Sequence, residues 1–201
     1  MMHPAEQYAA DVRSGKIPAC KFIRQAVERY YNDLENAVEK GWVFSRAKAE
    51  RAIRFIEKLP HTKGKWAGTL LKMEPWQMFL IWQLEGFLMA STGKRRFTEA
   101  YIQIPRKNGK TALAAAISLL HGYADKELGA ETYYAATHRD QARICFEMAK
   151  IMVEKSDLSK RSVVTRDAFT YEALGTTHRP VSSEAGNIEG TSPSCGIVDE
   201  Y

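Results

Sequence analysis

The chain has 201 residues and a mass of 22.7 kDa, which corresponds to one domain, or one domain with a small appendage. Hydrophobic residues make up 45% and charged residues 26%, values that exclude a disordered or fibrous protein. The net charge of +5 favours an anionic partner without naming it. Cys20, Cys145 and Cys195 lie far apart and form no CxxC pair. We therefore expect neither a disulfide framework nor a cysteine zinc site, and we expect a reducing compartment.

No targeting or membrane-spanning segment is expected. The first residues lack the basic and then apolar order of a signal peptide. The most apolar stretches, at 75–90 and 111–120, are interrupted by polar residues or are too short to cross a bilayer. The sequence therefore predicts a soluble intracellular protein.

The residues before about position 92 have helical patterns. Apolar residues recur every three or four positions over 19–39 and again over 45–59, where Ser45 is a suitable N-cap and Pro60 ends the helix. A third helix is predicted to begin near Pro75. It is followed by a loop with three adjacent cations, which is either simply solvated or in contact with DNA phosphates: Lys94, Arg95 and Arg96.

From residue 97 onward, the patterns of strands and helices alternate. Helices are predicted over 110–123, where alanine is frequent, and over 138–155. Strands are predicted over 97–104, 131–137, 162–165, 169–174 and 195–199. This alternation predicts an α/β protein with a parallel sheet.

The sharpest motif lies between the strand 97–104 and the helix that follows, in the loop Pro105-Arg106-Lys107-Asn108-Gly109-Lys110-Thr111. Gly109, Lys110 and Thr111 match the second half of the phosphate-loop pattern GxxxxGK[ST], although Ile104 replaces its first glycine. In such a loop, backbone amides surround a phosphate, the lysine reaches its oxygens and the hydroxyl binds Mg²⁺. The alternative is an ordinary helix start with a solvated lysine.

A second motif, Cys195-Gly196-Ile197-Val198-Asp199-Glu200, is an apolar strand that ends in two carboxylates. Asp199 is placed to hold Mg²⁺ through water, and Glu200 to polarise an attacking water. The alternative is a buried strand followed by a solvated acidic turn. Because the two motifs occur in the expected order on the expected elements, the sequence favours a nucleotide site.

A third motif, Glu74-Pro75-Trp76-Gln77, begins the third helix. The Gln77 amide can form two hydrogen bonds with the N6 and N7 edge of adenine, and Trp76 offers a face for stacking. Composition alone favours the alternative, a capped amphipathic helix whose Trp76 faces the core.

The sequence resembles the large subunit of tailed-phage terminases, the ATP-driven DNA-packaging motors, over nearly all of its length. The resemblance rests on YAADVRSGKIPACKFIRQAVERYYNDL, the PWQ element, IPRKNGKT, YYAATHRDQARICFEMAKIM and GIVDEY. It implies a RecA-like P-loop NTPase of the additional-strand, catalytic-glutamate class. A helical lid subdomain (1–92) would precede the ATPase core (93–201).

The resemblance also implies roles for individual residues. Gln77, with Trp76, would bind adenine, and Arg106 would contact the γ-phosphate beside Lys107 and Asn108. Lys110 and Thr111 would hold phosphates and Mg²⁺, Asp199 would assist the metal and Glu200 would activate water. The family continues past the acidic motif into a nuclease domain, so we expect this chain to be a truncated form, a sequence fragment or part of a split gene, and we assign it no nuclease residues.

The predicted function is therefore hydrolysis of ATP, with Mg²⁺, to drive double-stranded DNA into a procapsid in the host cytoplasm. The family implies a portal protein, a terminase small subunit and a homo-oligomeric ring as partners, with no membrane. Two alternatives stay open: a helicase-like or other P-loop ATPase, and a fragment that binds nucleotide without turnover.

Overall fold

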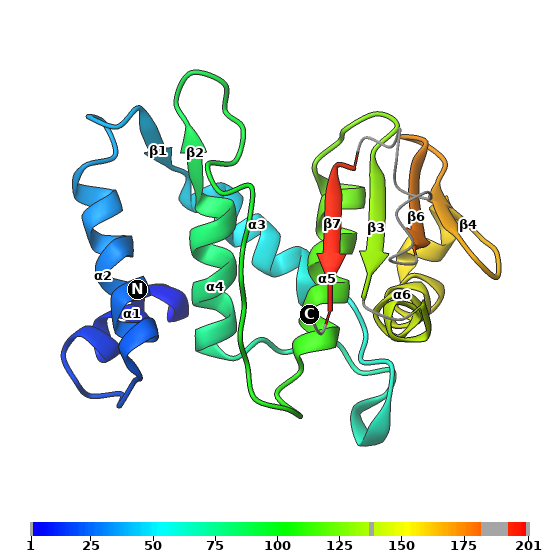
Figure 1. The fold of residues 1–201 in the computed structure, drawn as a ribbon, viewed down its shortest axis with the longest axis horizontal. Helices are drawn as coiled ribbons and strands as arrows, with labels where there is room; N and C mark the ends of the chain where they lie inside the picture. Colours follow the sequence, from blue (N-terminus) through cyan, green and yellow to red (C-terminus); the bar gives the residue numbers. More distant parts are fainter. Residues whose placement is uncertain (1, 137–138, 182–192, 200–201) are drawn as a thin grey trace. The chain divides into compact units, whose positions relative to one another are not determined.

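The computed structural model describes residues 2–136, 139–181 and 193–199 of the chain. They form helices and two sheets (Figure 1), organised as two compact units. The first unit comprises Met1–Arg54 and Lys72–Ile102, and the second comprises Phe55–Leu71 and Gln103–Tyr201. Among the described residues, no helix is both long and apolar enough to cross a membrane.

The first unit is mainly helical, as the periodicity predicts. Its helices are α1 (Pro4–Arg13), α2 (Lys21–Glu35), most of α3 (Arg46–Ile56) and α4 (Pro75–Gly86). Ser45 accepts a hydrogen bond from the Lys48 amide at 3.3 Å, which confirms it as the N-cap of α3. The unit also contains a short antiparallel pair that no sequence pattern predicted, β1 (Trp42–Phe44) and β2 (Phe87–Met89).

The core of the first unit is aromatic. The Trp82 indole on α4 is fully buried and donates a hydrogen bond to the Tyr30 hydroxyl on α2 at 3.1 Å. The rings of Phe79 and Phe87 meet the Tyr30 ring edge to face, and Phe44 packs against Trp82. These contacts bind α2, α4 and the β1–β2 pair together, because large aromatic side chains bury the most apolar area.

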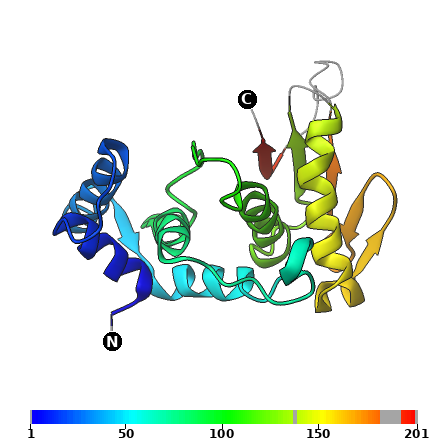
Figure 2. The same ribbon diagram turned by 90° about the horizontal axis from the view of Figure 1, so that it is seen from below.

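The second unit contains a five-stranded sheet with two long helices. Its helices are α5 (Lys110–Ala124) and α6 (Arg139–Glu154), with short 3-10 turns η1 (Gly64–Trp66) and η2 (Asp157–Arg161). The strands are β3 (Glu131–Ala135), β4 (Ser162–Val164), β5 (Phe169–Tyr171), β6 (Thr176–Pro180) and β7 (Cys195–Val198). In Figure 2, α5 and α6 lie beside these strands, and the two helices also pack against each other.

The sheet is mixed, which corrects the prediction of a parallel sheet. Its order is β4-β5-β6-β3-β7. The strands β6, β3 and β7 run parallel, whereas β4–β5 and β5–β6 are antiparallel. The short connections from β4 to β5 and from β5 to β6 favour hairpins, since parallel neighbours need a longer crossover. The α/β class itself is confirmed.

The prediction of a strand over 97–104 is wrong. Phe97 packs against Phe87 in the first unit, with the two ring centroids 6.2 Å apart, and the chain then continues without regular structure. Tyr101 is 88% exposed. A high strand propensity forms a strand only where a neighbouring strand supplies hydrogen bonds, and this segment has none in the described part of the chain.

Candidate nucleotide-binding site

The loop from Pro105 to Gly109 leads directly into α5, as the motif requires. The Asn108 side chain donates to the carbonyls of Pro105 and Arg106 at 3.2 and 3.1 Å, and these hydrogen bonds hold the loop in a tight turn. Lys107 and Gly109 both have left-handed backbones, with φ of 66° and 75°. Gly109 adopts this conformation without strain, whereas a residue with a side chain such as Lys107 rarely does.

The start of α5 suits an anion. Gly109 is the N-cap residue and has no side chain to cap the first amides of the helix. Those amides, together with the helix dipole, favour a negatively charged group such as a phosphate. The residues of 105–109 are all exposed, so this end of the helix is open to solvent.

Three of the predicted site residues converge where β7 ends. The Lys110 ammonium lies 3.3 Å from Asp199 Oδ1, and the Thr111 hydroxyl donates to Asp199 Oδ2 at 3.2 Å. Figure 1 shows the end of β7 beside α5, within the second unit. Asp199 is only 6% exposed, and its backbone amide donates to the Ala135 carbonyl on β3 at 3.1 Å. The sheet thus fixes the position of the Asp199 residue, and the first turn of α5 supplies the ion pair and the hydrogen bond of its carboxylate.

The oxygen atoms gathered here fit a magnesium ion. A threonine hydroxyl and a carboxylate are hard oxygen donors, which Mg²⁺ prefers to nitrogen or sulfur. Lys110 and Thr111 both contact the same carboxylate from the first turn of α5. The described donor atoms thus have the chemistry that Mg²⁺ prefers, and they lie at a helix start without a side-chain cap.

Cys145 on α6 is a neighbour of this site that the motifs did not reveal. Its thiol donates to the Thr111 carbonyl, with the sulfur 3.8 Å from the oxygen. Burial, and then the nearby Asp199 carboxylate, raises the pKa of the Cys145 thiol well above its ordinary value, so it stays protonated as a donor. Nothing in the spacing of the cysteines could have identified this contact, because it depends on how α6 packs on α5.

Two of the remaining predicted residues are described by the structure. Trp76 and Gln77 belong to α4 in the first unit, and both are half-buried. Gln77 Oε1 accepts a hydrogen bond from the Glu74 amide at 2.9 Å, which forms a capping box at the start of the helix. Because Trp76 is half-buried, it is not a fully buried core residue as Trp82 is. Glu200 lies outside the described residues.

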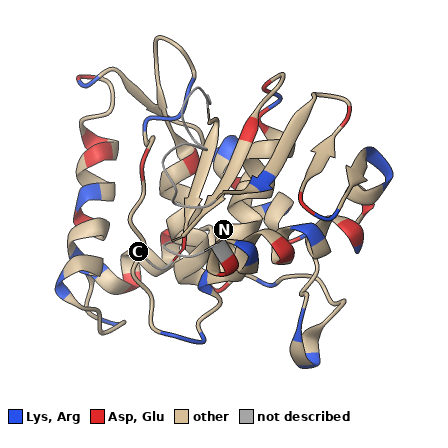
Figure 3. Cartoon of the chain, turned by 45° about the vertical axis from the view of Figure 1, so that its right-hand side comes forward, with Lys and Arg blue, Asp and Glu red and all other residues tan. Residues whose placement is uncertain are grey.

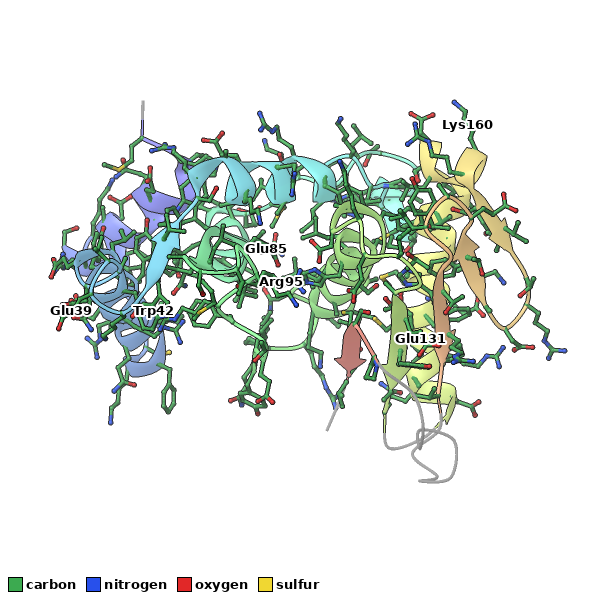
Figure 4. The ribbon with its side chains drawn as sticks, turned by 90° about the horizontal axis from the view of Figure 1, so that it is seen from above. Glu39, Trp42, Glu85, Arg95, Glu131 and Lys160 are labelled. Carbon is green, nitrogen blue, oxygen red and sulfur yellow. The ribbon has the colours of Figure 1, made fainter. Side chains whose placement is uncertain are left out.

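The cationic run after β2 is part of the first unit. The Arg96 guanidinium forms an ion pair with the buried Asp33 at 2.6 Å, and it lies 3.3 Å from the centre of the Trp42 ring. Arg95 Nη1 is 3.9 Å from Glu85 Oε2, and Figure 4 shows these two side chains next to each other. Arg96 is thus a packing residue, whereas Lys94 is exposed.

Comparisons with known proteins identify the family of the chain. A family model described as the ATPase domain of the terminase large subunit matches residues 75–201, more than half of the chain. The chain is 30% identical over 159 residues to a terminase large subunit of Enterobacteria phage HK97, covering 76% of this chain and 30% of that protein.

The crystal structure of the HK97 bacteriophage large terminase also matches. The TM-score is 0.64 at 26% sequence identity, and the match covers 76% of this chain and 31% of that one. The chain thus spans about a third of the length of these relatives. On the family match and the shared fold, it belongs to the terminase large subunit family, in the part that contains the ATPase domain.

Proposed function

We propose that this chain binds and hydrolyses ATP, and that the hydrolysis drives double-stranded DNA into a phage procapsid. The observation that carries the proposal is the convergence of Lys110 and Thr111 on Asp199, at the start of α5 and the end of β7. Membership of the terminase large subunit family supports it independently. This proposal includes the finer fold class, a RecA-like P-loop NTPase with an additional strand and a catalytic glutamate.

In this proposal, each residue of the first turn of α5 has a distinct role. Lys110 is paired with Asp199 before nucleotide binds, and its ammonium turns to the β- and γ-phosphate oxygens when they arrive. Thr111 and Asp199 would hold Mg²⁺, directly or through water. When bound, that ion neutralises charge on the phosphate oxygens. The uncapped amides after Gly109 would surround the phosphates.

Other residues complete the proposed chemistry. Arg106, in the exposed loop, would contact the γ-phosphate, with Lys107 and Asn108 shaping the loop around it. Glu200 follows Asp199 in the sequence, and we propose it as the carboxylate that orients the attacking water. Catalysis would then depend on positioning and charge neutralisation more than on covalent chemistry.

The remaining assignments concern the base and the wider assembly. Gln77 and Trp76 would read adenine, within a lid subdomain of residues 1–92 that precedes an ATPase core of 93–201. Double-stranded DNA, a portal protein, a terminase small subunit and further copies of the chain in a ring are the proposed partners. The proposed compartment is the cytoplasm of the bacterial host.

Removing the Thr111 hydroxyl tests the proposal. Thr111→Val keeps the shape of the side chain but loses one ligand, so ATP binding measured by calorimetry should depend less on Mg²⁺. We expect the ratio of affinities with Mg²⁺ and with a chelator to fall about tenfold, the equivalent of about 1.4 kcal/mol. Thr111→Ser is the matched control and should keep the ratio. An unchanged ratio in Thr111→Val would contradict the metal assignment.

A further inference from the structure

A rigid loop follows α3 in the second unit. Pro60 and Leu70 form an isolated antiparallel bridge, and the His61 amide donates to the Thr69 carbonyl at 2.8 Å. The Gly68 amide donates a hydrogen bond to the His61 carbonyl at 2.8 Å. We call residues 60–71 the basic loop. Its backbone hydrogen bonds fix the shape of the loop in the absence of any partner.

The tip of the basic loop combines positive charge with an exposed aromatic ring. Between Pro60 and Leu71 there are two lysines, Lys63 and Lys65, and no acidic residue. Both lysines are exposed. Trp66, which directly follows Lys65, is 57% exposed. The Lys65 ammonium lies 4.9 Å from the centre of the Trp66 ring. In Figure 3, the small loop at the lower right carries blue and no red.

The position of Trp66 is held by the loop itself. The Thr69 amide and hydroxyl both donate to the Trp66 carbonyl, at 2.9 and 2.7 Å. These hydrogen bonds fix the backbone of Trp66, and its exposed indole offers an apolar face beside the two lysines. Its neighbours are cations without acids, so the complementary surface is anionic.

We propose that the basic loop contacts the backbone of double-stranded DNA, with Lys63 and Lys65 against phosphates and Trp66 against the sugars of the groove edge. The proposal rests on the proposed function only in that DNA is the polymer concerned. A nucleic-acid backbone offers phosphates beside apolar sugar faces, which suits two exposed lysines next to an exposed indole.

The salt dependence of binding to a short mixed-sequence DNA duplex tests this contact. Each lysine–phosphate contact adds about 0.9 to the slope of log K against log salt concentration, so Lys63→Ala with Lys65→Ala should lower the slope by about 1.8. Trp66→Ala should weaken binding at every salt concentration without changing the slope. Lys155→Ala removes an exposed lysine of the same unit outside the loop and is the matched control.

The outcomes separate this contact from the nucleotide site. A double lysine variant with the wild-type slope overturns the proposal, as does a wild-type chain that does not bind the duplex. So does a Trp66→Ala variant that binds as tightly as the wild type. Stabilisation by Mg-ATP is measured on the same proteins, and the loop variants should retain it. Loss of that stabilisation in the wild type would count against ATP binding while leaving the DNA result valid.

Discussion

Gln77 has one observed role, in the capping box, and one proposed role, in binding adenine, and the two can be tested separately. Its Oε1 already accepts the Glu74 amide in the capping box, while its amide nitrogen can still donate to the N7 atom of adenine. A carboxylate at the same position keeps the acceptor for the cap and loses the donor for the base. Gln77→Glu therefore distinguishes a role in recognition from a role in the helix start.

We expect Gln77→Glu to weaken ATP binding by about 1–3 kcal/mol, because the variant lacks the donor to the adenine N7 atom and places an acceptor against it. The variant should keep the capping box and the stability of the wild type. Gln77→Ala should also weaken ATP binding and in addition lower stability by about 1 kcal/mol, through loss of the cap. Calorimetry with ATP and thermal melting measure the two effects. A Gln77→Glu variant that binds ATP as tightly as the wild type would leave Gln77 as a capping residue only.

Arg96 is the other residue whose role the structure changes. It pairs with a carboxylate that is 3% exposed, so Arg96→Ala leaves Asp33 as a buried charge without compensation. We expect a loss of about 3–5 kcal/mol in the free energy of unfolding, measured with denaturant. Lys94→Ala, two residues away and exposed, should have almost no effect. Equal effects of the two substitutions would contradict the buried pair.

At the scale of elements, a buried polar chain ties α5 to the sheet. Ser118 on α5, Tyr134 on β3 and His178 on β6 are joined through their side chains, with separations of 2.6 and 3.1 Å. His178 is stacked on Phe169 and lies so close to Gly122 that a Cβ there would meet its Nε2 at 2.1 Å. Gly122 is therefore required by packing and not by its backbone conformation.

Burial of His178 makes stability depend on pH. It lowers the pKa of His178 from 6.5 to about 3, because the charged imidazole loses its hydration. The unfolded chain takes up the proton first, so the contribution to stability is complete above about pH 6.5 and is lost progressively toward pH 3.

We expect this residue to add a slope of about 1.4 kcal/mol per pH unit to the unfolding free energy within that window. His178→Asn keeps a neutral partner for the Tyr134 hydroxyl and should remove the added slope. Denaturant unfolding between about pH 7 and pH 4 measures the difference. Identical slopes in the two proteins would show that His178 does not titrate in this way.

The elements differ in how far the sequence predicts them. The helix α5 follows from its run of alanines, and α4 from Pro75 at its first position. The strand β6 was not predicted from the sequence. Its residues, Thr176–Pro180, show no alternation of apolar and polar side chains and end in proline. The segment 97–104 has the opposite character, with strand-forming residues but no neighbour in the described part of the chain.

For the whole molecule, the site is predictable where it depends on local pattern. A glycine, a lysine and a threonine at a helix start, and an aspartate after an apolar strand, are short-range signals, and the structure brings Lys110, Thr111 and Asp199 together. The contact of Cys145 with Thr111 depends on packing between α6 and α5, which no local pattern encodes. The same holds for the pairing of Arg96 with Asp33.

The most direct test of the account is the stabilisation of the chain by Mg-ATP. A ligand that binds only the folded state at about 100 times its Kd adds about 2.7 kcal/mol, so the Tm should rise clearly. Lys110→Ala should abolish the rise while the melting transition stays cooperative, and Lys155→Ala, an exposed lysine in the same unit, should keep it. A wild-type Tm that does not respond to Mg-ATP, or an equal rise in Lys110→Ala, would contradict nucleotide binding at the start of α5.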